Sequence, residues 1–215
     1  MTWDWNYALK ILPDLMLGVW YTVLTTIASS AIALVGGLLL AIFESVSATF
    51  GRAFVRFWLE FFQGVPVLVL LYMGFYNLPE VGLTLPAMPI GIGILGIVYA
   101  AYCSEVYRGS LITIPSELRD ACVALSLSRL VTWQRVLIPL MVRRSVPALV
   151  NYILELFRVT ALLFAIGVPV LMGVAQLNAD ATFRYLEPFT LAGVFYICMN
   201  LPFLYLLSRV KAQHV

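Results

Sequence analysis

The stretch LGVWYTVLTTIASSAIALVGGLLLAIF, residues Leu17 to Phe43, decides the fold class. It carries no charged residue, and as a helix with a rise of about 1.5 Å per residue it is long enough to cross a hydrocarbon layer about 30 Å thick. Its many small residues, among them Gly36 and Gly37, let the backbones of neighbouring helices approach closely in lipid. The stretch therefore predicts a transmembrane helix.

The rest of the chain has the same character. Of its 215 residues, 62% are hydrophobic and only 11% are charged, whereas a soluble domain carries about 25% charged residues. This composition excludes an ordinary soluble globule and a disordered chain. The net charge of +2 is too small to indicate binding to nucleic acid.

Apolar runs of similar length recur along the chain. We expect an all-α membrane protein with five transmembrane helices in one domain, residues 1–215. The expected ranges are Leu17–Phe43, Phe57–Leu78, Pro89–Tyr107, Val146–Ile166 and Pro188–Leu207. Gly64 and Pro66 interrupt the second range, and because backbone groups freed inside a membrane are tolerated where a helix bends or lines a cavity, they predict a hinge.

The basic residues are distributed unevenly between the two sides. Ten of the 13 Lys and Arg residues fall in the connection between the first and second helices, in the connection between the third and fourth, and in the tail with Arg209 and Lys211. The opposite side carries only Lys10 and Arg184. Since cytoplasmic loops are enriched in Lys and Arg, we expect the N-terminus outside and the C-terminus in the cytoplasm.

Residues that perform chemistry are scarce. Cys103, Cys122 and Cys198 are widely spaced, the only histidine is His214, and neither a Walker A sequence nor a nucleophile elbow is present. We therefore expect no metal site, no cofactor and no enzymatic activity. If the protein does energy-driven work, another chain must bind the nucleotide.

The connection from Gly109 to Arg144 is the only sizeable polar segment. Ser116 is placed as an N-cap, and Glu117 and Asp120 supply acids in the first turn, where the helix dipole favours them. The apolar residues recur at helical spacing and form one stripe: Leu118, Ala121, Cys122 and Leu125. Such a helix can lie on lipid, insert into a groove of a soluble partner, or be a solvated connector.

Two serines then interrupt this helix. Ser126 and Ser128 break or redirect the chain, and a second short helix is expected from Arg129 to Ile138, ending at Pro139.

Here the residues carry a family resemblance. Asp120-Ala121-Cys122, followed by Ser126 and then by Val136-Leu137-Ile138-Pro139, resembles the EAA loop of ABC importer permeases. Upstream, Ser104 to Ser110 with Ile114-Pro115 resembles the segment that precedes that loop in polar amino-acid permeases. Further motifs extend the likeness over roughly Pro13 to Arg209: Glu60 to Pro66, Arg143 to Pro147, Thr160-Ala161-Leu162, and Gly167 to Gln176.

The resemblance implies a permease subunit of the inner membrane without catalysis of its own. In this family two permease subunits, identical or sister chains, pair in the membrane. Two cytoplasmic ATPases, which bind ATP and Mg, dock beneath them, and a substrate-binding protein delivers a polar amino acid or similar small zwitterion from outside. The loop supplies a coupling helix that sits in a groove of the ATPase. The residues that match this role are Glu117, Leu118, Asp120, Ala121, Cys122, Leu125, Ser126 and Pro139.

Some positions depart from the family pattern. The usual glutamate is Asp120, the second small residue is Cys122, the usual glycine is Ser126, and the usual arginine of the second helix is Gln63. Tyr152 stands where the family often has a glutamate. Because serine tolerates a tight turn less well than glycine, the backbone of the loop is expected to differ slightly at Ser126.

Glu155 and Arg158 place two charges near the middle of the fourth helix. Their i, i+3 spacing puts them on one face, where they can pair, and charges at this depth must be paired or face a wet cavity. They either contact a zwitterionic solute, with Arg158 toward the carboxylate and Glu155 toward the ammonium, or form a structural ion pair. Together with Gln63, Tyr152 and Thr160 they make up the expected substrate pathway.

Alternative functions remain at this point. An importer of ectoine or another compatible solute fits the same family. A channel or proton-coupled carrier acting alone would need no ATPase, although the inverted repeats common in such carriers are not visible. A membrane-embedded enzyme would need clustered acids, a histidine or an activated nucleophile.

Overall fold

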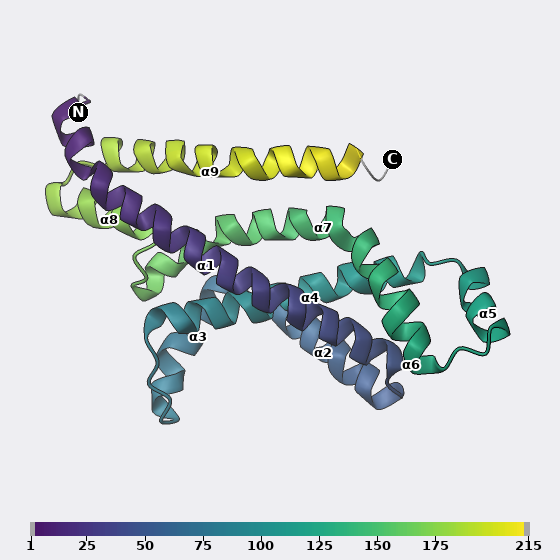
Figure 1. Cartoon of the computed structure of the whole chain (residues 1–215). Coiled ribbons are helices and arrows are strands. Elements are labelled where there is room, and N and C mark those ends of the chain that lie inside the picture. Colours follow the sequence, from purple (N-terminus) through teal and green to yellow (C-terminus); the bar gives the residue numbers. More distant parts are fainter. Residues whose placement is uncertain (1–2, 213–215) are drawn as a thin grey trace.

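The computed structural model describes the backbone of residues 3–212 and the side chains of residues 3–202 and 205. Every regular element within this range is helical, as the sequence predicts. Arg209, Lys211 and His214, which entered the sequence argument, lie outside the described side chains. Figure 1 shows long helices running past one another, with the N-terminus at one end and a small helix, α5, projecting at the opposite end.

The first helix, α1 (Trp5–Val46), is 42 residues long and begins twelve residues before the expected Leu17. Asp4 caps it by accepting hydrogen bonds from the backbone N–H groups of Asn6 and Tyr7 at 2.9 and 3.2 Å. The early turns bury Ile11 and Leu15 and leave Lys10 and Asp14 exposed. The expected start was wrong because the apolar run marks only the membrane-crossing part, whereas this amphipathic extension continues the same helix.

Glycines bring α1 close to α4 (Ala87–Ile112). A Cβ atom on Gly37 would lie 2.6 Å from the Cβ of Cys103 and 2.9 Å from the backbone oxygen of Ala100, and one on Gly36 would lie 3.1 Å from the Cβ of Ala100. The role predicted for these two glycines is confirmed, because no larger residue leaves this spacing intact.

The second expected helix is broken in two. The helices α2 (Thr49–Gly64) and α3 (Val67–Glu80) meet at an angle of 100°. Pro66 lacks a backbone N–H and stands as the cap of α3, and Val65 has extended backbone. Gly64 and Pro66 thus lie at a sharp bend, while their role as a moving hinge stays a prediction.

The expected end of a helix at Pro139 was wrong. The elements α6 (Arg129–Thr132), η1 (Trp133–Leu137), α7 (Ile138–Val159) and η2 (Thr160–Ile166) form one continuous helical segment. A proline inside an α-helix clashes with the carbonyl four residues earlier. Here η1 is a wider π-helical turn, in which the N–H of Ile138 bonds to the carbonyl of Trp133, five residues back. This turn accommodates Pro139 without ending the helix.

The remaining helices are α8 (Leu171–Thr182) and α9 (Leu186–Ala212). The short α8 was not foreseen, because a search for runs of about 20 apolar residues passes over it. It packs against α1 where a Cβ on Gly18 would meet the Cα of Leu171 at 2.8 Å.

Within the described residues, three helical segments are long and apolar enough to cross a membrane: α1, α4 and Arg129–Ile166. The bent pair α2–α3 makes a fourth if it counts as one span. The fifth expected range falls on α9, whose side chains are described only in part. The five-helix count therefore stays a prediction.

Candidate coupling surface and membrane pathway

The helix α5 (Ser116–Ala124) projects at the end of the molecule opposite the N-terminus (Figure 1). Its boundary matches the sequence prediction, but Ser116 is not its cap. Pro115 occupies the N-cap position, Ser116 is the first helical residue, and no side chain caps the end. The proline fixes the backbone angle that starts the helix and so replaces a hydroxyl cap.

The predicted apolar stripe of α5 is divided between two surroundings. Cys122 is 5% exposed and Leu118 packs against the core of its own chain. Leu125, by contrast, is 72% exposed, and Ala121 is also exposed. The prediction that all four residues form one surface for a partner was therefore wrong, because helical geometry turns Leu118 and Cys122 inward. The exposed surface of this segment includes Glu117, Asp120, Ala121, Val123 and Leu125.

A tight turn follows α5. Ser126 adopts a positive φ of 52°, the left-handed region that favours glycine. The N–H of Leu127 bonds to the carbonyl of Cys122 at 3.0 Å, and that of Ser126 to the carbonyl of Val123 at 2.8 Å, which is a Schellman ending. Ser126 thus takes up the conformation typical of glycine instead of avoiding it.

Two arginines tie α5 to the membrane helices. Arg119 donates to the backbone oxygen of Leu111 in α4 at 3.2 Å. Arg144 of α7 donates to the backbone oxygen of Thr113 at 2.6 Å and contacts its hydroxyl at 3.3 Å. These bonds join α5 to α4, and α7 to the corner that connects α4 with α5.

The predicted pathway residues occupy different environments. Tyr152 is half-buried and stacks on Tyr102, with 5.4 Å between ring centroids, and Gln63 is half-buried near the end of α2. Thr160 is fully buried, and its hydroxyl donates to the backbone oxygen of Phe157 at 2.6 Å. The hydroxyl of Thr160 thus serves its own helix in this structure, and its place in the substrate pathway stays a prediction.

Glu155 and Arg158 are exposed on α7. Among the described residues no hydrogen bond or ion pair joins them, so the structural ion pair is not the arrangement found. Arg158 lines an open pocket of about 360 Å³ together with Tyr196 and Asn200. The side-chain oxygen of Asn200 is buried and has no hydrogen-bond partner within the described part of the chain.

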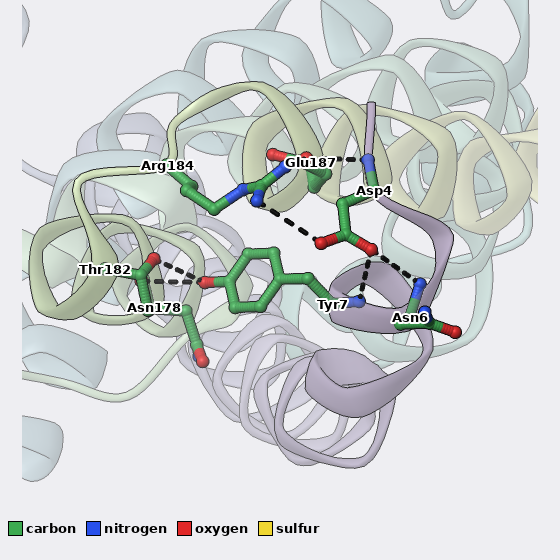
Figure 2. Close-up of polar contacts among 7 residues, drawn as sticks. All are labelled: Asp4, Asn6, Tyr7, Asn178, Thr182, Arg184 and Glu187. Atoms are coloured by element: carbon green, nitrogen blue, oxygen red, sulfur yellow. Dashed lines mark hydrogen bonds and ion pairs between the residues drawn. The ribbon is translucent and has the colours of Figure 1, made fainter. Parts of the chain in front are cut away.

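A cluster of polar contacts closes the end of the molecule opposite α5 (Figure 2). Arg184 donates to Glu187 at 2.6 Å and to Asp4 at 3.3 Å, and the backbone N–H of Asp4 donates to Glu187 at 3.0 Å. The hydroxyl of Tyr7 donates to the backbone oxygen of Asn178 at 2.9 Å. We call this set of residues the outer clamp, because it joins the start of α1 to α8 and to the start of α9.

The charges of the outer clamp shift one another's pKa. The hydrogen bond from Arg184 lowers the pKa of the Glu187 carboxyl below its ordinary 4.5, and burial opposes this only in part. The same hydrogen bond raises the pKa of Arg184. Both residues precede the predicted span Pro188–Leu207.

Comparison with known proteins decides the family. Residues 33–212 match the family model described as "Binding-protein-dependent transport system inner membrane component". The chain belongs to this family of inner membrane components. It is 30% identical to the "Probable amino-acid ABC transporter permease protein y4tG" of Sinorhizobium fredii over 205 residues, covering 93% of this chain and 89% of that protein. It is 29% identical to the "Glutamine transport system permease protein GlnP" of Escherichia coli, covering 99% and 98%.

Solved structures agree with the fold. A structure described as "an amino acid ABC transporter with histidines" matches with a TM-score of 0.89 and 26% identity, covering 99% of this chain and all of that chain. The inward-facing MetNI methionine ABC transporter matches with a TM-score of 0.73 at 19% identity, a likeness that concerns the fold alone.

This inner membrane component is thus a permease subunit of an ABC importer, located in the inner membrane, and not itself an enzyme. The sequence resemblance is confirmed. ATP hydrolysis belongs to separate subunits, and the family works with an ATPase, a substrate-binding protein and another permease. The stand-alone carrier and the membrane enzyme are not favoured.

Several functional residues escaped the sequence argument. Arg144 counted as a basic residue for orientation and as part of the motif Arg143 to Pro147 but was given no role of its own, Arg119 was not singled out, and the pairing of Asp4 with Glu187 spans 183 positions. The one available signal was the concentration of Arg and Asp or Glu just outside the apolar runs.

Proposed function

We propose that this permease subunit moves a polar amino acid or similar small zwitterion into the cytoplasm. Two such permease subunits, identical or sister chains, would pair, receive the solute from a binding protein outside, and be driven by two ATPases that bind ATP and Mg. The amino-acid relatives support the substrate class. The observation that carries the proposal is the protruding α5, which exposes Leu125 and Asp120, is bonded to α4, and follows a corner at Thr113 that is bonded to α7.

The proposed topology has five membrane crossings, with the N-terminus outside and α5 in the cytoplasm. The distribution of basic residues supports it, since Arg119, Arg129, Arg135 and Arg144 lie on or near α5. A thiol reagent that cannot cross membranes tests it. Cysteine introduced by Glu80→Cys reacts in intact cells, whereas cysteine introduced by Leu125→Cys reacts only after permeabilisation; the reverse order refutes the topology.

The proposed solute site lies beside α7. Arg158 contacts a carboxylate, Glu155 contacts an ammonium, and Asn200 offers an unused acceptor in the same pocket as Arg158. Two opposite charges that stay unpaired within the described chain are costly in a membrane unless a cavity or a solute compensates them. Gly64 and Pro66 are the proposed hinge at the bend between α2 and α3.

Charge reversal on α5 tests the coupling role. Asp120→Lys and Ala121→Trp change the exposed face without touching the buried Cys122, so both variants insert normally but lose uptake and stimulation of the ATPase by the binding protein. Asp14→Lys, at the other end of the chain, is the control for charge reversal and retains basal ATP hydrolysis. Normal uptake by both α5 variants refutes the coupling role.

A further inference from the structure

Two open pockets meet on the α5 side of the molecule. The first, which we call the α5 pocket, has a volume of about 430 Å³ and lies between α5, α6 and the end of α4. The second, the α1 groove, has a volume of about 480 Å³ and runs between the end of α1 and the start of the α6–α7 segment. Arg129 and Trp133 line both pockets, so the two spaces are neighbours on either side of these side chains.

The α5 pocket is cationic. Arg119 and Arg129 line it, and among the described side chains no acidic residue lines either pocket. Arg119 uses one N–H for the backbone oxygen of Leu111, and the guanidinium of Arg129 has no hydrogen bond or ion pair with any residue the structure describes. Arg56 and Arg108 differ, because each lies 3.9 Å from the buried Glu44. A guanidinium without a carboxylate partner presents a fork of donors that suits a phosphate group.

The α1 groove is apolar. Apart from Arg129 and Gln134, its lining consists of Ile42, Val46, Leu130, Trp133 and Ile138. Ile42 and Val46 belong to the last turns of α1 and Ile138 to the first turn of α7, so in the proposed topology the groove lies at the cytoplasmic surface of the bilayer. Trp is enriched at this depth.

An apolar groove that opens beside two arginines matches an amphiphile with an anionic head. We propose that an anionic phospholipid binds here, with its phosphate between Arg119 and Arg129 and an acyl chain in the α1 groove. Basic pockets on the cytoplasmic side of membrane proteins recognise anionic headgroups in this way. The phosphate bridges α5 to α6 and thereby fixes the coupling helix against the membrane helices. The proposal does not depend on the solute that is carried.

Quenching of Trp133 fluorescence by brominated lipid tests the site. The purified protein is placed in nanodiscs with dibrominated phosphatidylglycerol or dibrominated phosphatidylcholine, and the signal that Trp133→Phe removes is assigned to Trp133. The wild type is expected to prefer phosphatidylglycerol, and Arg129→Gln to lower this preference about five-fold, since a basic residue near the surface contributes about that factor to anionic lipid binding. Arg119→Gln, a second variant, lowers it similarly.

Arg135→Gln is the matched control, because Arg135 is exposed in the neighbouring turn η1 and lines neither pocket. An unchanged preference in this variant supports the site. An equal loss of the lipid preference in Arg135→Gln overturns the proposal, because it means that diffuse surface charge attracts the lipid. Loss of the preference in millimolar inorganic phosphate assigns the arginines to a soluble anion and also overturns it. Absence of quenching by either lipid means that protein fills the groove, which refutes the proposal.

Discussion

Replacement of Leu125 by alanine tests how α5 engages its ATPase. Full burial of a leucine side chain contributes about 1.5–3 kcal/mol, and 72% of Leu125 is exposed in the chain. If the ATPase groove covers this surface, Leu125→Ala loses about 1–2 kcal/mol of binding free energy at each interface between α5 and an ATPase. That corresponds to roughly 5–30-fold weaker docking of each ATPase. The stability of the permease itself changes little, because Leu125 supports no other side chain of the described core.

The assay is binding of the isolated ATPase to the permease in nanodiscs, measured by biolayer interferometry alongside the thermal midpoint of the permease. Phe50→Ala serves as the control, since Phe50 is 87% exposed at the start of α2 and lies outside the proposed docking surface. An unchanged affinity in Leu125→Ala, or an equal loss in Phe50→Ala, refutes the assignment of α5 as the docking element.

Three further perturbations address the pathway, the turn after α5 and the outer clamp. Arg158→Gln should raise the KM for uptake by about ten-fold or more, because a hydrogen bond to a charged group contributes about 1.5–3 kcal/mol; poor assembly with an unchanged KM would point to a structural role. Ser126→Gly should stabilise the permease by about 1 kcal/mol, because glycine adopts the left-handed conformation without the Cβ clash. A lower midpoint of thermal unfolding in detergent would contradict this prediction. Glu187→Gln should lower the thermal midpoint of the permease at pH 7, and the difference in midpoint from wild type should disappear as the pH falls below 4.5. The ionised Glu187 carboxylate stabilises the fold at pH values above its ordinary pKa, and this contribution is lost as the pH falls through the lowered pKa, while Arg184 stays charged. A difference in midpoint that persists at acid pH would show that the charge of Glu187 does not stabilise the outer clamp.

The sequence contained the helical class and the position of α5, since long apolar runs and the proline at 115 are local signals. The continuous helix through Pro139 was hidden, because a proline normally ends a helix and only the π-helical turn before it relieves the clash. The division of the α5 stripe was hidden too. Periodicity identifies Leu118, Cys122 and Leu125 as one face, but which of them meets its own chain depends on how α4 and η1 pack around it.

The proposed solute pocket could also be predicted from the sequence only in part. The charges of Glu155 and Arg158 are conspicuous in an apolar run, so the sequence points to them. Asn200 and Tyr196 lie about 40 positions away on α9 and reach Arg158 only through the packing of α9 on α7. Residues that meet through tertiary packing have no signature in the local pattern.

The outer clamp has a consequence for biosynthesis. Asp4 leaves the ribosome 183 positions ahead of Glu187. At a synthesis rate of roughly 5–20 residues per second, Asp4 waits about 10–40 s for its partner. The helix α1 therefore has to persist in the bilayer without its final neighbour, and this contact can close only once the first residues of α9 have been synthesised.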